Sequence, residues 1–169
     1  MPDLHGYYAR TLESLHTQDP SLKRIFHGSV FSAATYNLGP RTVCFKHKDS
    51  ANLAFGMCAV TALGKFDGTK GGHFILWECA LVVEFPPGST ILLPSATISH
   101  SNVNVGKNER RYSFTQYTAG DIFQWVENGF KLNNEMTPEE SADRILRDSQ
   151  RWAWGLSLIP QLNLGLYNR

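Results

Sequence analysis

Three side chains able to bind a metal ion stand at His47, Asp49 and, much later in the chain, His100. Residues two apart on a β-strand point to the same face, so His47 and Asp49 would project into one space. A second imidazole, His100, would join them from a distant strand. Two imidazoles and one carboxylate leave half of an octahedral metal open, as in non-haem Fe(II) oxygenases. We therefore predict that His47, Asp49 and His100 are the metal ligands and the catalytic residues.

A cation and a hydroxyl follow the second histidine, at Arg111 and Ser113. In a strand these residues also share a face, so both can reach one carboxylate, which an arginine binds through two parallel hydrogen bonds. This predicts a binding site for an acidic co-substrate. Arg110 is an alternative cation, although the Arg-x-Ser alternation favours Arg111. A His-x-Asp pair alone occurs on surface strands by chance, and the ordered set of all five residues is what indicates a site.

The elements that must position these residues are mainly β-strands with flanking helices. Short runs of β-branched and aromatic residues, broken by turn residues, predict many strands of a sandwich or barrel. These runs span residues 30–37, 41–47, 53–63, 73–77, 80–85, 90–93, 96–100 and 111–117. They place a β-core at about residues 29–130.

A helix is expected on each side of this core. Residues 3–16 have an amphipathic pattern, with Leu4, Tyr8, Leu12 and Leu15 on one side. Thr137, Pro138 and Glu140 form a helix-start signature, which predicts a C-terminal helix at about 138–153. We expect one face of that helix to be lined by Ala142, Ile145, Leu146, Ser149, Trp152 and Ala153. Trp152 and Trp154 are expected to pack rather than to bind a ligand.

Composition places the chain in the class of folded domains. Its 169 residues fit one domain, 1–169, and 42% hydrophobic with 18% charged residues is typical of a protein with a core. A net charge of +1 indicates that any nucleic-acid contact must come from local patches. Cys44, Cys58 and Cys79 are interpreted as reduced core thiols. Without a secretory signal or a membrane-length apolar run, we expect an intracellular, nuclear monomer with no membrane association and no obligate protein partner.

From residue 31 to residue 130 the chain resembles the TET/JBP-like dioxygenase domains of mushroom-forming fungi. The resemblance lies in the stretches FSAATYNLGP, HKDSANL, TALGKFDGTKGGHFILWE, VVEFPPGSTILLPSATISHSN and ERRYSFTQYTAGDIFQWVENGF. It implies a double-stranded β-helix (a jelly-roll, cupin-like core), Fe(II), 2-oxoglutarate and O2. Nothing in these 169 residues resembles the long additional domains of animal TET proteins, which puts the choice of substrate in question.

The same resemblance implies substrate-binding residues and a substrate. The His-x-Asp motif runs on to Asn52, which in TET enzymes corresponds to a contact with the flipped methylated base. Asn37, Asn102 and Tyr117 are implied to lie near the pocket. The expected substrate is a methylated nucleobase in nucleic acid, with 5-methylcytosine in DNA as first choice and N6-methyladenine as second, and lysines near the site could contact phosphates.

Two other classes of function stay open on the sequence alone. One is a 2-oxoglutarate-dependent hydroxylase of a small molecule or of a protein side chain, which the near-neutral charge and small frame allow. The other is a non-catalytic β-barrel binding module, or a cupin-like metal protein with other chemistry. The complete ligand set argues against the inactive module, and His-x-Asp in place of His-x-His argues against the usual cupin site.

Overall fold

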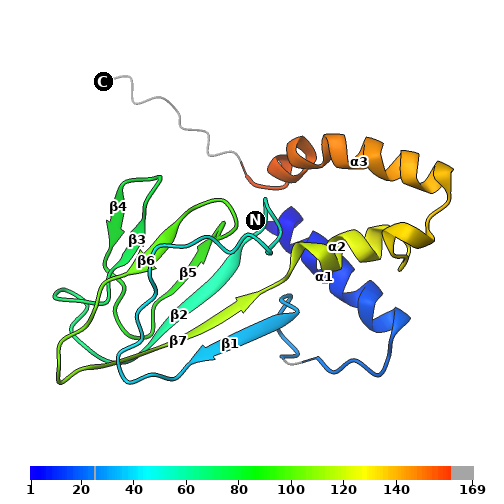
Figure 1. Ribbon diagram of the computed structural model, residues 1–169. Helices are drawn as coiled ribbons and strands as arrows, with labels where there is room; N and C mark the ends of the chain where they lie inside the picture. The colour runs from blue at the N-terminus through cyan, green and yellow to red at the C-terminus, as the bar shows by residue number, and fades with distance from the viewer. Residues whose placement is uncertain (25, 161–169) are drawn as a thin grey trace.

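The computed structural model describes residues 1–24 and 26–160, and its centre is a pair of antiparallel sheets (Figure 1). The larger one, here the major sheet, has the strand order β1 (Ala33–Asn37), β7 (Arg110–Tyr117), β2 (Cys58–Lys65) and β5 (Thr90–Leu93). The smaller one, the minor sheet, has the order β4 (Leu81–Val83), β3 (Phe74–Leu76) and β6 (His100–Asn102).

The chain passes back and forth between these sheets. After β1, residue Arg41 forms a bridge to β7 of the major sheet, and His47 forms one to β6 of the minor sheet. The strand β2 returns to the major sheet, β3 and β4 lie in the minor sheet, and β5, β6 and β7 then alternate. This alternation of antiparallel strands between two facing sheets is the topology of a jelly roll, or double-stranded β-helix. The fold class predicted from the sequence is confirmed.

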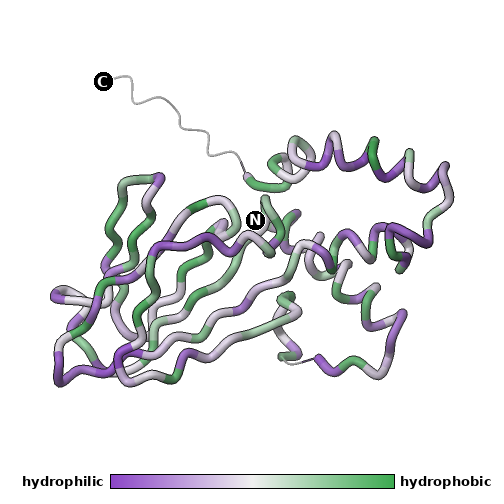
Figure 2. The backbone as a smooth tube through the Cα atoms, viewed as in Figure 1, coloured by the Kyte–Doolittle hydropathy of each residue, from purple (hydrophilic) through white to green (hydrophobic). Residues whose placement is uncertain are grey.

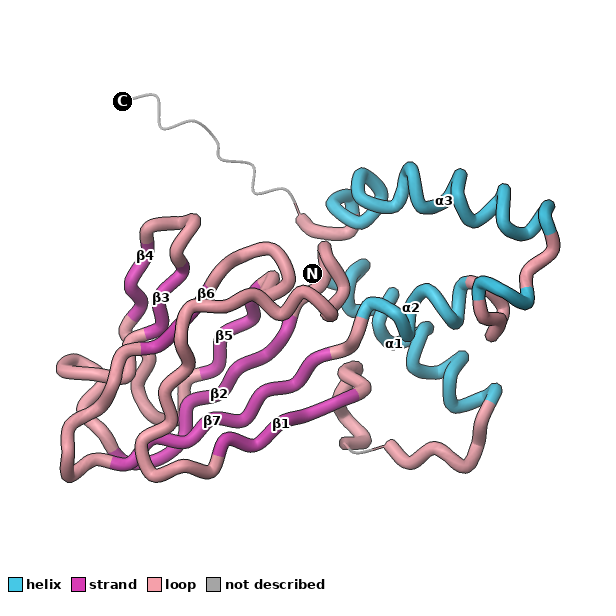
Figure 3. Tube along the Cα trace, in the orientation of Figure 1, coloured by secondary structure: helices cyan, strands magenta, loops and turns pink. Residues whose placement is uncertain are grey.

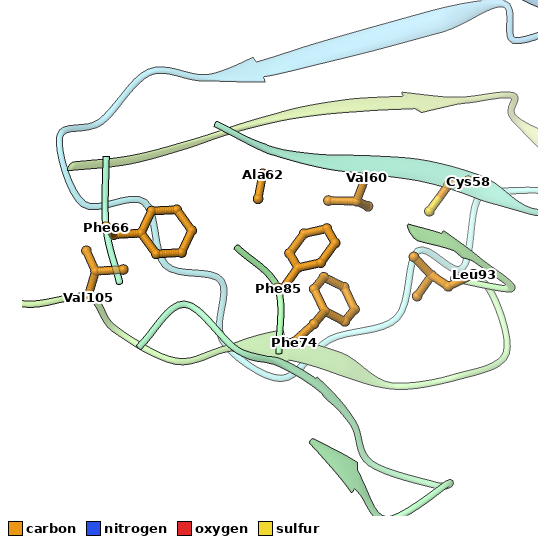
Figure 4. Close-up of a cluster of buried hydrophobic side chains, with 8 residues drawn as sticks. All are labelled: Cys58, Val60, Ala62, Phe66, Phe74, Phe85, Leu93 and Val105. Carbon is orange, nitrogen blue, oxygen red and sulfur yellow. The ribbon is translucent and has the colours of Figure 1, made fainter. Parts of the chain in front are cut away.

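The core of the jelly roll lies between the sheets (Figure 4). Alternating residues of β2, namely Cys58, Val60 and Ala62, supply the part of the core that comes from the major sheet, because successive side chains of a strand point to opposite faces. Its buried members are Cys58, Val60, Ala62, Phe66, Phe74, Phe85, Leu93 and Val105. Phe74 and Phe85 pack edge to face, with ring centroids 5.5 Å apart. Both sheets therefore pack on one apolar layer. The cavity of the candidate site borders this layer at Val60 and Phe74.

The helices gather at one end of the strands (Figures 1 and 3). They are α1 (Pro2–Gln18), α2 (Gly120–Glu127) and α3 (Pro138–Ser157), with a 3-10 turn at Asn133–Glu135. The expected amphipathic helix is confirmed as α1, which buries Leu4, Tyr7, Tyr8 and Leu12. A second apolar cluster joins α1 to Phe55 and to Phe123 of α2. None of the helices in the described ranges is long and apolar enough to cross a membrane.

The C-terminal helix begins as predicted but packs differently. Thr137 accepts a hydrogen bond from the backbone N–H of Glu140, whose side chain accepts one from Thr137 N–H, so the predicted capping box is confirmed. The expectation that Trp152 packs is wrong, since it is 50% exposed, and Ile145 and Leu146 on the expected apolar face are 62% and 60% exposed. Figure 2 shows apolar residues along α3 interspersed with hydrophilic ones. Within α3, Gly155 is the one buried residue.

What holds α3 is its C-terminal end. Trp154 packs edge-on against Tyr7 and Phe55, with ring centroids 4.9 and 5.9 Å apart. Gly155 lies so close to the Phe55 ring that a Cβ atom at this position would overlap it. Arg151 pairs with Glu127 of α2. The helix is therefore anchored at a few points rather than along a buried stripe.

Several other expectations are corrected by the structure. The β-core ends at Tyr117, because the following segment, expected to belong to the β-core, forms α2. The strand expected at 96–100 begins only at His100, since Thr97 and Ile98 donate backbone hydrogen bonds to Pro94 in a turn. The strand expected at 41–47 makes bridges only at its ends. All three cysteines are free, but Cys79 is exposed and Cys44 is half-buried, so only Cys58 is a core thiol.

Candidate metal centre and cavity

His47, Asp49 and His100 converge as the sequence predicts. One ligand atom from each residue lies within 4.8 Å of the other two. Nε2 of His47 is 3.5 Å from Oδ1 of Asp49, and Nε2 of His100 is 3.8 Å from Oδ2 of the same carboxylate. The two imidazole centroids are 4.3 Å apart. The set thus offers two nitrogens and one carboxylate around a single point, the donor set of the non-haem Fe(II) sites.

Backbone pairing brings the two histidines together. His47 and His100 exchange both backbone hydrogen bonds, at 3.1 and 2.9 Å, across the edge of the minor sheet. Asp49 is not on a strand, as the prediction assumed, but in the turn that follows. Its N–H donates to the Ser95 carbonyl at 2.9 Å, which turns the carboxylate back toward the imidazoles. The shared face of His47 and Asp49 is therefore produced by a tethered turn rather than by strand alternation.

Each imidazole is held in a defined orientation. Nδ1 of His47 lies 2.7 Å from the Phe45 carbonyl, and Nδ1 of His100 lies 3.0 Å from the Ile98 carbonyl. A carbonyl oxygen only accepts, so Nδ1 carries the proton and the lone pair of the neutral ring is on Nε2. Burial lowers the pKa of His100, which favours its neutral form. Both Nε2 atoms are thus prepared as ligands facing Asp49.

A carboxylate outside the ligand set ties the two ligand-bearing segments together. Glu78 accepts hydrogen bonds from the N–H and the hydroxyl of Ser99, both at 2.7 Å. It also pairs with Lys48, whose Nζ is 3.3 Å from Oε1. Lys48 lies between the ligands His47 and Asp49, and Ser99 directly precedes His100. These contacts lower the pKa of Glu78 to about 2, the Ser99 hydroxyl being the largest cause. Nothing in the sequence pattern pointed to this residue.

The predicted cation faces the same space. Arg111 and Ser113 are consecutive inward-facing residues of β7, 1% and 3% exposed, whereas Arg110 is exposed. The choice of Arg111 over Arg110 as the inward-facing residue is therefore confirmed in its geometry. Opposite Arg111 on β2 stands Gly64, with φ of 118°, where a Cβ atom would overlap the Arg110 carbonyl. A glycine is needed there for β2 and β7 to pair beside the arginine.

The environment of Arg111 suits an anion. Its Nη1 donates to the Thr42 carbonyl at 3.2 Å, but its buried Nε has no partner among the described residues. Burial lowers its pKa, because desolvation disfavours the charged form. Nearly all buried polar atoms in folded proteins have a hydrogen-bond partner. A buried guanidinium with an unused donor, next to an open cavity, fits the binding of a carboxylate.

The ligand set and the guanidinium open into one cavity of about 460 Å³. This volume lies within the range of small-molecule sites. The walls come from both sheets. Val60 of β2 and Phe74 of β3 are its apolar core residues, and most of the other lining side chains are polar. The remaining lining residues are Thr35, Asn37, Cys44, His47, Asp49, Ser50, Ala51, Asn52, His100, Ser101, Asn102, Arg111, Ser113, Thr115 and Tyr117.

The asparagines predicted as substrate-binding all line this cavity, in different environments. Asn37 donates to the Ser113 hydroxyl at 2.9 Å, and Asn52 donates to the Ser95 hydroxyl at 3.0 Å. Asn102 is buried and braces the backbone: its Oδ1 accepts from Cys44 N–H at 2.8 Å, and its Nδ2 donates to the Val103 and Thr42 carbonyls. The substrate roles of these residues stay predictions, and Asn102 is the one whose amide is most fully engaged within the protein.

Other lining residues were not singled out by the sequence. Cys44 lies on the cavity wall beside Arg111, where burial raises the pKa of its thiol. Thr115 continues the inward row of Arg111 and Ser113, so the two-residue period of β7 would have found it. Tyr117, expected near the pocket, ends the same row, and its hydroxyl lies 3.3 Å from that of Thr35. Together these side chains make the part of the cavity wall formed by β7 largely polar.

No family model and no curated protein sequence matches the chain. Among solved structures, NgTET1 in complex with 5mC DNA aligns over 66% of this chain, with 17% identity and a TM-score of 0.48. The viral collagen prolyl hydroxylase vCPH from Paramecium Bursaria Chlorella virus-1, in its 2OG complex, aligns over 63% of this chain and 68% of its own, with 10% identity and a TM-score of 0.36. The match spans 47% of the NgTET1 chain, so this chain covers about half of that length.

Proposed function

We propose that this protein is an Fe(II)- and 2-oxoglutarate-dependent dioxygenase that oxidises the methyl group of a methylated nucleobase. One observation carries the proposal. The imidazole–carboxylate–imidazole set and the buried guanidinium of Arg111 open into the same cavity. A metal site alone fits many proteins, and a buried arginine alone fits any anion. Their combination fits a metal that binds together with an acidic co-substrate.

The chain would hold iron through Nε2 of His47, Nε2 of His100 and the carboxylate of Asp49. When bound, iron with 2-oxoglutarate and O2 supplies hydroxylation of a C–H bond, with succinate and CO2 as the other products. The protein supplies binding and orientation. The Nδ1 contacts hold both rings in place, and the carbonyl of Ser95 holds the turn that carries Asp49.

Arg111 and Ser113 would hold the carboxylate of the co-substrate that lies away from the metal. The orphaned Nε of Arg111 gives a second donor beside Nη1, as bidentate binding of a carboxylate requires. The Ser113 hydroxyl, which accepts from Asn37, still has its own proton to donate. The carboxylate would neutralise the charge of Arg111, which is 1% exposed, and this attraction favours binding despite the cost of desolvation.

The substrate proposal, 5-methylcytosine in DNA before N6-methyladenine, is supported by the motif resemblance and by the position of Asn52. Asn52 lies on the cavity wall three residues after Asp49. Its side-chain nitrogen donates to Ser95, and its side-chain oxygen has no hydrogen-bond partner among the described residues. An amide can donate and accept, so it can read the edge of a base. A base in a duplex must leave the stack to reach such a cavity.

The test is direct. The protein is incubated with Fe(II), 2-oxoglutarate and DNA or RNA that carries 5-methylcytosine or N6-methyladenine, and oxidised nucleosides and succinate are measured by mass spectrometry. We expect oxidised 5-methylcytosine with wild type and none with Asp49→Ala. Succinate formation without any oxidised nucleoside would retain the dioxygenase and remove the nucleobase as its substrate.

A second candidate is hydroxylation of a small molecule, for which the cavity volume of about 460 Å³ is sufficient. In that case 2-oxoglutarate turnover would rise with a small C–H substrate and stay unchanged with methylated DNA. A protein side chain is the other alternative substrate, and peptides in the same assay would reveal it.

A further inference from the structure

The backbone just before His47 contains one extra residue. His47 and His100 exchange backbone hydrogen bonds, and Asn102 N–H then donates to the Cys44 carbonyl at 3.2 Å. Between these paired positions lie two residues on one segment, Phe45 and Lys46, and one residue on β6, Ser101. This two-to-one arrangement is a β-bulge. The backbone bends at Lys46. Bulges beside active sites commonly redirect a side chain.

The side chain that this bulge redirects is an aromatic one. Phe45 is 84% exposed, the highest exposure among the large hydrophobic residues of the described chain. Its neighbours at the ends of the bulge, Cys44 and His47, both line the cavity, so the backbone that carries Phe45 runs along the cavity wall. The second bulge residue, Lys46, is held elsewhere, with its Nζ 4.6 Å from the centre of the Trp77 ring. The bulge thus leaves one aromatic ring exposed to solvent on the segment that borders the candidate site.

The segment that carries Phe45 is basic. Residues 20–48 contain five lysines and arginines and no aspartate or glutamate. Arg41 and Lys46 lie on either side of Phe45 and are exposed. Nearby, Lys65 and Arg110 face each other across β2 and β7, and neither forms an ion pair within the described residues. Like charges opposite each other destabilise a sheet unless a partner neutralises them. A polyanion is the partner that suits this side of the rim.

We infer that Phe45 enters the base stack of a nucleic-acid duplex when the target base moves into the cavity. The inference rests on the proposed function, and it adds the form of the substrate and the residue that recognises it. Proteins that bend or open a duplex insert apolar wedges, including phenylalanine, between base steps. Here the ring would pack on the bases beside the extruded one, while Arg41 and Lys46 contact phosphates. A ring with this role has to be exposed, rigidly placed and next to the cavity.

The experiment compares Phe45→Ala and Phe45→Trp with wild type. The probe is a DNA duplex with 5-methylcytosine next to 2-aminopurine, whose fluorescence rises when its neighbour leaves the stack, and binding is measured with Mn²⁺ and without O2. A single strand of the same sequence serves as the comparison. Leu146→Ala is the matched control, since Leu146 is 60% exposed on α3. Mn²⁺ binding is measured for every variant, because the Phe45 carbonyl orients the ligand His47 and a backbone change would weaken metal binding.

For Phe45→Ala we expect affinity for the duplex to fall by roughly tenfold or more and the fluorescence rise to disappear, because stacking contributes that much per base. Affinity for the single strand should change by less than about threefold, and Phe45→Trp should restore duplex binding. Equal losses on duplex and single strand, or none on either, would overturn the inference. If wild type oxidises 5-methylcytosine but Phe45→Ala opens the duplex normally, only the role of Phe45 is lost. If wild type produces no oxidised base in any DNA, the proposed function itself fails.

Discussion

Replacing Arg111 by methionine should change protein stability and co-substrate binding in opposite directions. The guanidinium is 1% exposed, makes one hydrogen bond to Thr42 and has an Nε without a partner in the described chain. Replacing buried ion pairs by apolar side chains of similar volume is often neutral or stabilising by about 1–4 kcal/mol, and we expect the same sign and size for this buried guanidinium. At roughly 2–4 °C per kcal/mol for a chain of this size, a stabilised Arg111→Met without ligand should melt about 2–16 °C above wild type.

Binding of 2-oxoglutarate should show the reverse. A hydrogen bond to a charged group contributes about 1.5–3 kcal/mol, so losing the guanidinium should weaken affinity by roughly 10- to 150-fold. Wild type with ligand at 100 times its Kd gains about 2.7 kcal/mol of stability, a gain that should fall to about 0.3–1.4 kcal/mol in Arg111→Met at the same ligand concentration. Scanning calorimetry with and without 2-oxoglutarate, and isothermal titration in the presence of Mn²⁺, measure both effects.

The exposed neighbour provides the control. Arg110→Met should leave 2-oxoglutarate binding unchanged and alter the melting temperature little, because its side chain lies in solvent. The reasoning is refuted if Arg111→Met melts below wild type and still binds 2-oxoglutarate normally, or if Arg110→Met is the variant that loses binding.

Three further changes test the site and the helical layer. Asp49→Ala should abolish Mn²⁺ binding in titration calorimetry and leave the circular dichroism spectrum unchanged, since the carboxylate is a third exposed; retained binding would contradict the ligand assignment. Glu78→Gln should weaken Mn²⁺ binding about tenfold by loosening both ligand segments. Glu84→Gln, at an exposed glutamate with no ion pair among the described residues, is the control and should have no effect. Burial raises the pKa of Tyr8 well above 10, so its stabilising contribution is complete below pH 10 and is lost as pH rises further. Above pH 10 the free energy of unfolding should therefore decrease less steeply with pH in Tyr8→Phe than in wild type.

Local regularities explain what the sequence could predict. Side chains two apart on any strand share a face, so Arg111 and Ser113 could be assigned to the same face of β7 from their spacing alone. The start of α3 was readable because a capping box uses four consecutive positions. The order of His47, Asp49 and His100 indicated a metal site although the position of Asp49 in a turn was not foreseen.

The features that were missed depend on partners far away in the chain. The residues of α2 include Ile122, Phe123, Trp125 and Val126, which favour strands, and the segment becomes helical because Phe123 is buried completely against α1. The bulge at Phe45 exists only in relation to β6, so no pattern within residues 41–47 could reveal it. Glu78 acquires its role from Lys48 and Ser99, which are 30 and 21 residues away.

Because α3 is anchored at only a few points among the described residues, it is expected to unfold before the rest of the protein. A helix that buries little apolar surface along its length contributes little to the cooperative core, and such elements can unfold on their own. Its N-terminal half starts with the capping box and contains the Arg144–Asp148 pair, both internal to the helix and its cap. Its recorded polar contacts to other segments are the Lys131–Glu140 ion pair and the hydrogen bond from Arg147 to Asn128. The amide protons of that half should therefore exchange with solvent long before those of β2 and β7. Detachment of α3 would uncover Phe55 and leave the jelly roll closed, so the metal centre can persist in a molecule that has already lost part of its helical layer.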